Sequence, residues 1–372
     1  MRLLKYSLLI ITFLVLVISI GGYFVLHQPQ FGQKPQGVHL DIIKSSPQYI
    51  DDIFENSDVI DMEMSFSKII EIIKAYMEEV QGMRPDSLPI LHPDLNVIEH
   101  SPDTVTALTW FGHSAFLLEM DGKKILLDPM LGPAAAPFSF QVNRFSNDLP
   151  IAIKDLPFID AVIFSHDHYD HLDYHTVMLI KDKVSSFYVP LGLGSHLKHW
   201  GIAEDKIFEL DWWDEASFEG IELACTPSQH FSGRGLNDRA STLWSSWVIK
   251  GKRSKVFFSG DSGYFPGFKK IGEKYGPFDL AMVECGQYNK LWHDIHMLPE
   301  ESAQAAVDLK ADMMMPIHWA MFELSLHPWK EPVERLTVKA KELNMPIFTP
   351  KIGERVTLNT PLTSEPWWEE VK

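Results

Sequence analysis

The pattern of apolar and polar positions first identifies a segment at the start of the chain. From Ser7 to Leu26, twenty consecutive residues carry no charge. At about 1.5 Å rise per residue, a helix of this length covers the roughly 30 Å hydrocarbon core of a bilayer. A cleaved signal peptide has a shorter apolar run, of about 7 to 15 residues, and ends in an A-x-A-like site that this segment lacks. We therefore expect residues 1–27 to form an uncleaved membrane anchor, with a cleaved signal peptide as the alternative.

The charges that flank this apolar run predict its orientation. Arg2 and Lys5 precede the run, and Lys34 is the first Lys or Arg after it. Because positive charge is retained on the cytoplasmic side, the N-terminus is expected in the cytoplasm. The chain is then a single-pass membrane protein whose remaining residues lie outside the cytoplasm.

Residues 28–103 have the pattern of a linker and an N-terminal extension. The stretch "HQPQFGQKPQG", which begins at His27, is polar and rich in turn formers. Further on, residues 66–80 place apolar side chains at helical spacing. These side chains are Ile69, Ile70, Ile73, Tyr76 and Met77. We expect this stripe to pack on the main domain rather than on lipid.

From residue 104 onward, short apolar segments alternate with turns and with helical patterns. The residues "TALTWFGHSAFLLEMDGKKILLDP" predict two strands around the turn at Asp121 and Gly122. Helices are predicted at 299–311 and 332–344, each with a proline in its first turn. Residues 104–372 are therefore expected to form one α/β domain.

Composition and charge narrow the functional classes. The chain has 372 residues, of which 45% are hydrophobic, so a large core is available. Its formal net charge of −17 repels phosphate backbones, and no basic block compensates locally, which excludes nucleic acid as an expected partner. The two cysteines, Cys225 and Cys285, allow no thiolate zinc site and are expected in the core.

Polar clusters follow four of the apolar segments. The residues "FSHDHYDHLD" at 164–173 come directly after one segment, and His230, Asp261 and His318 follow the others. The four segments lie at 158–164, 221–225, 255–258 and 312–315. Because sites in α/β sheets assemble beyond the carboxyl ends of strands, we expect these side chains to converge on one edge.

The chemistry of these side chains indicates a metal centre. The first cluster supplies four possible ligands within six residues, namely His166, His168, Asp170 and His171. One tetrahedral metal does not need seven donors, so adding His230, Asp261 and His318 predicts two metals about 3.5 to 4 Å apart. A solvated polar loop is the alternative for a lone histidine, but H-x-H-x-D-H after a strand is a specific pattern.

Two other histidines are expected outside the site. His196 and His199 lie at helical i, i+3 spacing, with no acidic residue near them in the sequence. We interpret them as structural or exposed side chains. Asp128, which ends the apolar segment "KILLDP", has two interpretations, either orienting a ligand imidazole or forming the turn before Pro129.

These motifs together resemble a known family. "HDHYDH" at 166–171, "PSQH", "SGDSGY" and "PIHW" occur in the order and context of the metallo-β-lactamase superfamily, over residues 104–357. Within it, the residues at 230–249, 295–305 and 315–336 resemble the N-acyl-phosphatidylethanolamine-hydrolysing phospholipase D branch and its bacterial relatives. The chain departs from that branch before residue 104 and at 284–294, which leaves the headgroup of the substrate open.

The resemblance implies a fold and a set of ligands. The fold is an α/β structure, the αββα sandwich of the metallo-β-lactamases, here preceded by a transmembrane helix. The expected cofactors are two Zn²⁺ ions, with iron or manganese as alternatives. One zinc is assigned to His166, His168 and His230, the second to Asp170, His171 and His318, and Asp261 bridges them.

The resemblance and the metal centre together imply a hydrolase. Paired metals lower the pKa of a shared water toward about 7, so no protein nucleophile is required. The residues assigned to catalysis are Asp170, Asp261 and His296, the last as an auxiliary acid or charge stabiliser. We expect a zinc-dependent phosphodiesterase of phospholipase D type whose partners are the membrane and a phospholipid of N-acyl-phosphatidylethanolamine type.

Two other classes remain as alternatives. The first is a lactonase, β-lactamase or other C–O or C–N hydrolase, although zinc β-lactamases have a cysteine where this chain has Asp261. The second is a non-catalytic membrane module. For the phospholipase, several aromatic side chains are candidates for holding acyl chains, with a role in the core as the alternative. They are Phe138, Phe140, Tyr264, Phe265, Trp292 and Phe322.

Overall fold

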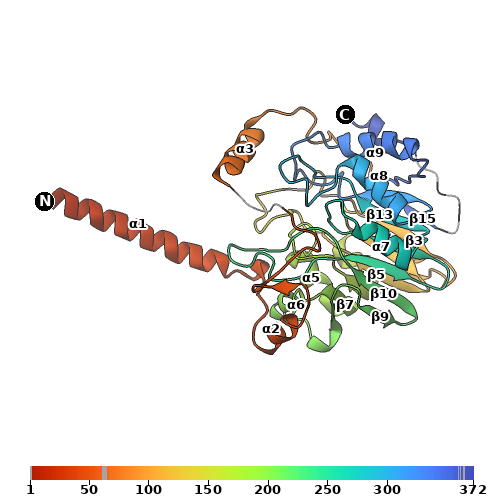
Figure 1. Cartoon of the computed structure of the whole chain (residues 1–372), viewed down its shortest axis with the longest axis horizontal. Coiled ribbons are helices and arrows are strands. Elements are labelled where there is room, and N and C mark those ends of the chain that lie inside the picture. Colours follow the sequence, from red (N-terminus) through yellow and green to blue (C-terminus); the bar gives the residue numbers. More distant parts are fainter. Residues whose placement is uncertain (1, 61–64, 359, 361, 363–364) are drawn as a thin grey trace.

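The structure is a computed structural model that describes residues 2–60, 65–358, 360, 362 and 365–372. Two mixed β-sheets lie at the centre of a single α/β domain, and helices cover them on the outside (Figure 1). This is the αββα sandwich that was expected. Helix α1, Arg2–Leu26, projects from the domain (Figure 1).

The first sheet has seven strands in the order β15-β3-β4-β5-β6-β7-β8. From β5 to β8 the neighbouring strands are parallel, and the other pairs are antiparallel. Parallel strands buried on both faces read as nearly continuous apolar runs, as in "IDAVI" of β6. The strands are β3 Ala107–Trp110, β4 Phe116–Met120, β5 Lys123–Leu127, β6 Ile159–Ile163, β7 Val184–Pro190, β8 Ile207–Leu210 and β15 Arg355–Thr357.

The second sheet has six strands in the order β14-β13-β12-β11-β10-β9. Strands β12, β13 and β14 are parallel, and the remaining pairs are antiparallel. The strands are β9 Glu215–Phe218, β10 Ile221–Thr226, β11 Ser246–Lys250, β12 Lys255–Phe258, β13 Leu280–Glu284 and β14 Met314–Ile317. The four apolar segments predicted from the sequence correspond to β6, β10, β12 and β14.

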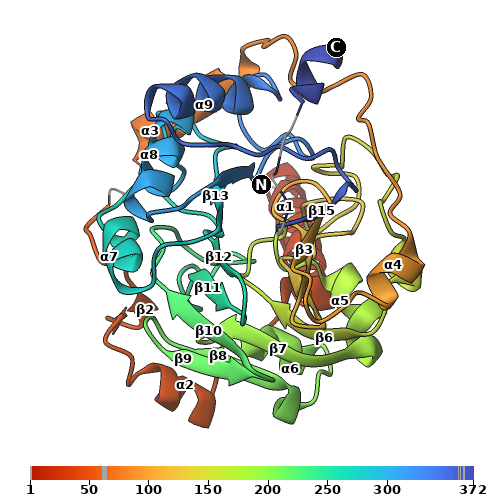
Figure 2. The ribbon, with the colours of Figure 1, turned by 90° about the vertical axis from the view of Figure 1, so that its right-hand side faces the viewer.

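The helices divide into those that cover the sheets and those that precede them. Helices α5 and α6 pack beside the first sheet, and α7, α8 and α9 lie beside the second (Figure 2). The helices predicted at 299–311 and 332–344 are present as α8 and α9. The bounds are α2 Val38–Ile43, α3 Phe66–Met77, α4 Leu95–Glu99, α5 Tyr174–Ile180, α6 Gly194–His199, α7 Gly267–Lys274, α8 Pro299–Asp308 and α9 Glu331–Glu342. A short two-stranded sheet, β1 Tyr49–Ile50 and β2 Ile53–Phe54, lies between α2 and α3.

The side chains on the two faces of the first sheet belong to two different hydrophobic clusters. Because side chains alternate along a strand, Leu118 and Leu127 join the larger cluster, while Leu117 and Leu126 face the other way. The larger cluster joins residues of both sheets, and the smaller one includes Val177 of α5. Both predicted core cysteines are buried and unpaired.

The predicted hairpin around Asp121 and Gly122 is confirmed, but one of its strands is divided. Asp121 and Gly122 both have positive φ, at 52° and 77°, as a two-residue turn requires. A further turn, at Gly112 and His113 with φ of 89° and 55°, separates β3 from β4. The expectation of two strands was therefore wrong: the segment forms three, and the additional turn carries a histidine.

Residues 28–103 are more than a linker. Ile43 and Phe54 are buried in the larger cluster, and Ile98 is buried in the smaller one. The extension therefore contributes buried side chains to both hydrophobic clusters of the domain.

Helix α3 differs from the sequence expectation in the direction of its apolar side. Ile69, Ile73, Tyr76 and Met77 are exposed, so the prediction that this stripe packs on the domain was wrong. The side of the helix that carries Lys68, Glu71 and Ile72 faces a cavity in the domain, and Tyr76, at the border of the stripe, also lines this cavity. Its apolar stripe consequently faces outward.

Candidate metal centre

The seven predicted ligands lie together at one edge of the two sheets. Each follows a strand: β6 precedes the run of 166–171, and β10, β12 and β14 precede His230, Asp261 and His318. The structure brings all of them within reach of one another, in overlapping groups that could hold metal ions. The predicted convergence at the carboxyl ends of strands is therefore observed.

Three imidazole nitrogens form the first group. The Nε2 atom of His166 lies 2.9 Å from Nδ1 of His168, which lies 3.2 Å from Nε2 of His230. His166 and His230 are buried, and His168 is half-buried. This arrangement presents three nitrogen donors to one point.

One carboxylate and two imidazoles form the second group. The Oδ2 atom of Asp170 lies 3.3 Å from Nε2 of His171 and 3.1 Å from Nε2 of His318. Both imidazoles are buried at the edge of the sheets.

Asp261 lies between the two groups. Its Oδ2 atom is 3.1 Å from Nε2 of His171 and of His318, and 3.8 Å from Nε2 of His166 and of His230. Its Oδ1 atom is buried without a hydrogen-bond partner among the described residues. Because Oδ2 lies near donors of both groups, this one oxygen is in the position that a shared ligand of two cations would occupy.

The donor set suits divalent metals such as zinc. Ligands about 2.0 to 2.1 Å from a tetrahedral ion lie roughly 3.3 Å apart, which is close to the spacings within each group. Burial lowers the pKa of His166 and of His230 well below the usual value, so both rings are held in the neutral form that binds metal.

The carboxylates of the site are held in the ionised form. Burial raises the pKa of Asp170 and of Asp261. The adjacent histidines, His171 first among them, have the larger combined effect and hold both pKa values well below the usual range. Burial alone lowers the pKa of His171 and His318, while Asp261 and Asp170 raise it above the usual value. The negative charge of these carboxylates is thus balanced by protons here, and a metal cation can balance it instead.

The opposite ring nitrogens are fixed by hydrogen bonds. His171 Nδ1 lies 2.7 Å from Asp128 Oδ2, and His230 Nδ1 donates to the carbonyl oxygen of Ile295 at 3.0 Å. Ser165 Oγ lies 2.9 Å from His166 Nδ1 and donates to Asp128 Oδ2 at 2.5 Å. Such bonds commonly orient metal-binding histidines. Of the two interpretations of Asp128, the structure supports the orienting one.

Asn56, in the N-terminal extension, supports the site in a way that the sequence did not suggest. Its side chain accepts a hydrogen bond from the backbone N–H of His230 at 3.0 Å and donates to the His230 carbonyl at 2.8 Å. The same Oδ1 atom accepts from Trp244 Nε1 at 3.0 Å. This pair of bonds fixes the backbone of a candidate ligand.

Two further residues were also missed. His113, in the turn between β3 and β4, places Nε2 2.9 Å from Asp170 Oδ2. Glu284, the last residue of β13, lies 2.9 Å from His296 Nδ1 and 3.5 Å from His318 Nδ1. His113 comes shortly after an apolar strand and Glu284 ends one, so the rule that located the other side chains could have found them.

The remaining sequence predictions for histidines are located as follows. His296 precedes α8 and lies beside His230, with ring centroids 5.0 Å apart. His196 is buried, and its Nε2 atom lies 3.1 Å from Asp167 Oδ2, so an acidic partner comes from the metal-binding loop. His199 is exposed.

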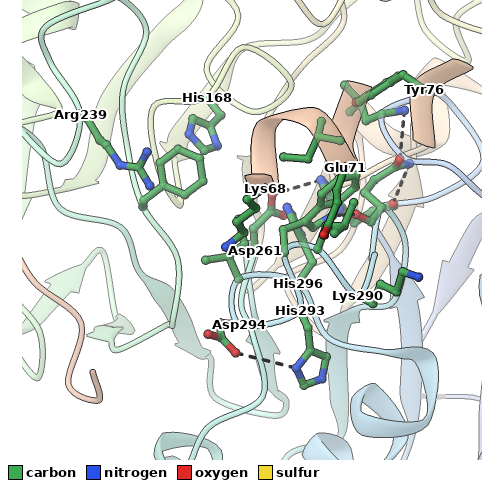
Figure 3. A pocket seen from close by; sticks show the side chains of 18 of the residues that line it. Lys68, Glu71, Tyr76, His168, Arg239, Asp261, Lys290, His293, Asp294 and His296 are labelled. Atoms are coloured by element: carbon green, nitrogen blue, oxygen red, sulfur yellow. Dashed lines mark hydrogen bonds and ion pairs between the residues drawn. The ribbon is translucent and has the colours of Figure 1, made fainter. Parts of the chain in front are cut away.

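A cavity of about 830 Å³ opens over the metal donors. Figure 3 shows His168 and Asp261 in it, with Lys68, Glu71 and Tyr76 of α3 on one side. Its other walls carry cationic and apolar side chains. They are Arg239, Lys290, Phe231, Ile72, Leu291, Trp292, Ile295 and Leu324.

Only one of the six aromatic residues suggested for acyl chains lines this cavity, namely Trp292. Phe265 and Phe322 are buried in the larger hydrophobic cluster, so for these two the core alternative is correct. Phe138 is half-buried, and Phe140 and Tyr264 are exposed away from the cavity lining.

Comparisons with known proteins agree with this geometry. A family model described as "Beta-lactamase superfamily domain" matches residues 123–319. An uncharacterized protein of Mycobacterium tuberculosis is 39% identical over 333 residues, covering 88% of this chain and 88% of that protein. N-acyl-phosphatidylethanolamine-hydrolyzing phospholipase D 1 of Caenorhabditis elegans is 35% identical over 241 residues, covering 61% of this chain and 68% of that protein.

A solved structure shares the fold. Igni18, a metallo hydrolase from the archaeon Ignicoccus hospitalis, is similar with a TM-score of 0.53 at 22% identity, covering 68% of this chain and 98% of that chain. The chain belongs to the metallo-β-lactamase superfamily. Within it, the chain is a metal-dependent hydrolase.

Proposed function

We propose that the chain is a phosphodiesterase of phospholipase D type that acts on a membrane phospholipid resembling N-acyl-phosphatidylethanolamine. The observation that carries the proposal is the composition of the cavity over the metal donors. It combines cationic Lys68, Arg239 and Lys290 with apolar walls. An anionic phosphodiester attached to acyl chains requires both features. The name of the Caenorhabditis elegans relative supports the same substrate class.

The proposed cofactors are two zinc ions, because histidine nitrogens and carboxylate oxygens suit zinc, with iron or manganese as alternatives. His166, His168 and His230 would hold one ion, Asp170, His171 and His318 the other, and Asp261 both. When bound, such a pair lowers the pKa of water toward about 7 and stabilises negative charge on a phosphoryl group.

His296 is the proposed acid of the reaction. Its Nδ1 atom lies 2.9 Å from the carboxylate of Glu284, and the ring lines the cavity. Glu284 therefore fixes the ring and leaves its Nε2 edge for the substrate. From there His296 can donate a proton to the headgroup oxygen as the P–O bond breaks. Asp170 and Asp261 would contribute as carboxylate ligands of the cations.

The proposed location is the membrane, with the catalytic domain outside the cytoplasm. Residues Lys5–Leu26 form a helix long and apolar enough to cross a bilayer, and none of it is buried in the protein. A signal sequence would pass the same test of length and composition. An anchor would keep the cavity close to its proposed substrate without any added affinity.

The test is a product analysis with purified, metal-supplemented protein. On N-acyl-phosphatidylethanolamine, mass spectrometry should detect phosphatidic acid and N-acylethanolamine, and oxygen-labelled water should label the phosphate. Opening of lactones or β-lactams with every phospholipid left intact would replace the proposal by the second hydrolase class. No turnover of any of these substrates by fully metallated protein would favour the non-catalytic module.

A further inference from the structure

The outer face of α3 is apolar, and none of the described residues covers it. Phe66 is 79% exposed, Ile73 54% and Met77 81%. They lie at helical spacing along one side, whereas Lys68 and Glu71 on another side line the cavity. A helix on a soluble domain ordinarily turns its apolar side inward. The reversed orientation leaves a strip of apolar surface beside the cavity.

A second exposed apolar site lies in a loop between two residues of the cavity lining. Phe231 and Arg239 line the cavity, and Leu236, in the loop between them, is 80% exposed. Leu236 shares a surface pocket with Leu26 and His27, where α1 ends. The mouth of the cavity therefore lies between α3 and a loop that adjoins the apolar helix.

Phe140 is a further exposed apolar side chain, in a segment that contacts the residues after α1. It is 80% exposed and stacks on Phe138, with ring centroids 5.6 Å apart. Phe138 in turn lies 6.1 Å from Phe31, five residues after α1. Exposed apolar groups thus surround the point where α1 meets the domain.

The segment after α1 is fixed to the domain. Trp200 Nε1 donates to the carbonyl oxygen of Pro29 at 2.7 Å, and Arg234 Nη2 donates to that of Gln30 at 2.8 Å. Both views place α3 on the side of the domain from which α1 projects (Figure 1, Figure 2). A bilayer crossed by α1 would therefore meet the side that carries α3.

We propose that Phe66, Ile73, Met77, Phe140 and Leu236 form a docking face that inserts into the surface of the bilayer crossed by α1. The occupant of this face is lipid, because the face adjoins the end of the apolar helix and borders the mouth of the cavity. Lys74 in the last turn of α3 supplies a cation at the level of lipid phosphates. The inference rests on the proposed function for the bilayer that α1 crosses and for the phospholipid that enters the cavity from it.

The first experiment measures contact with lipid without using activity. Met77→Cys and Leu236→Cys are each labelled with an environment-sensitive dye in the full-length protein reconstituted into phosphatidylcholine vesicles. Labelling is selective because Cys225 and Cys285 are buried. Val338→Cys, exposed on α9, is the matched control. We expect spin-labelled lipids to quench the dye at positions 77 and 236, but not at 338.

Two results would overturn the proposal. One is quenching at positions 77 and 236 no stronger than at 338. The other is a shielded but unquenched dye, which would place a second copy or another protein on this face. Neither result depends on which substrate is cleaved, so they are distinct from a failure of the proposed function.

A second measurement connects the face to turnover. The double variant Ile73→Glu with Met77→Glu should lower the ratio of hydrolysis of bilayer phospholipid to that of a soluble short-chain analogue by roughly tenfold, because charge disfavours insertion. Val338→Glu should leave this ratio unchanged. An unchanged ratio in the double variant would contradict docking as the route of substrate entry.

Discussion

Arg234 donates two hydrogen bonds to the carbonyl oxygen of Gln30, from Nε at 3.0 Å and from Nη2 at 2.8 Å. Its Nη1 atom donates to the carbonyl oxygens of Asp167 and Leu172, at 2.5 Å and 2.8 Å. One buried guanidinium thus joins the segment after α1 to the loop that carries four candidate metal ligands. This side chain therefore helps to set the position of the candidate metal centre relative to the end of α1.

Replacing this arginine should therefore loosen both segments. In Arg234→Met, three buried carbonyl oxygens lose a donor, and a lost partner costs about 1–3 kcal/mol. A total loss of about 3 kcal/mol lowers Tm by on the order of 4 °C in a domain of this size. Differential scanning calorimetry measures the shift, and proteolysis should become faster after residue 28. Arg253→Met, at an exposed turn, is the control, and equal Tm values for the two variants would contradict this role.

Metal content tests the bridging position of Asp261. The metal-supplemented protein should bind close to two metal ions per chain, as a two-metal site requires. Asp261→Ala should lower that number, because Oδ2 of Asp261 lies between both groups of donors. Inductively coupled plasma mass spectrometry gives the stoichiometry. The control Glu222→Ala, at an exposed position near the start of β10, should bind as many metal ions as the wild type. Two metals retained in the Asp261 variant would show that this carboxylate is not a bridge.

Most of the candidate site could be predicted from the sequence because its residues follow a local rule. Apolar strands such as "IDAVI" have a recognisable composition, and the parallel strands among them end at one edge. His166, His168, Asp170 and His171 then fall within one loop, where spacing alone indicates a metal. The resemblance supplied the division of these side chains between two ions. In the structure, His166, His168 and His230 form one group of possible ligands, and Asp170, His171 and His318 belong to another that also contains His113.

His296 should be separable from the metal ligands by a matched pair of variants. We expect His296→Ala to lower kcat on the order of 100-fold, as loss of a general acid does, and to keep its metal. His166→Ala should lose both activity and metal, because His166 Nε2 belongs to the first group of donors. His199→Ala, on the exposed end of α6, should alter neither property. A large loss of metal in the His296 variant would move His296 into the ligand set.

Asn56 could not have been predicted, since its partner His230 lies 174 residues away in the sequence. Its isolated position in a polar stretch gives no periodic signal, and only the tertiary structure brings it to the site. His113 was missed for a different reason. The glycine turn at 112 and 113 was not recognised, so this histidine was assigned to the interior of a strand. The outward stripe of α3 was missed because periodicity identifies an apolar side but not its direction.

Asn56→Ala should weaken metal binding although Asn56 does not belong to either group of donors. Loss of its two hydrogen bonds frees the backbone of His230, and supports of this kind commonly change metal affinity by about 10- to 100-fold. Competition with a chelator measures the affinity. Asn96→Ala, exposed in α4, is the control. Equal affinities for the two variants would mean that His230 is positioned without Asn56.

The orientation in the membrane is tested with introduced cysteines, because the native ones are buried. Arg2 and Lys5 precede the apolar run, so the positive-inside rule predicts a catalytic domain outside the cytoplasm. In intact cells, a membrane-impermeant maleimide should label Val338→Cys, and should label Tyr6→Cys, which keeps both Arg2 and Lys5, only after lysis. The protein should also remain in the membrane after a carbonate wash, which removes proteins that are only bound to the surface. Labelling of position 6 but not of position 338 in intact cells would show the opposite orientation. Release of the whole catalytic domain from the cells would instead indicate cleavage after the apolar helix, as in a signal peptide.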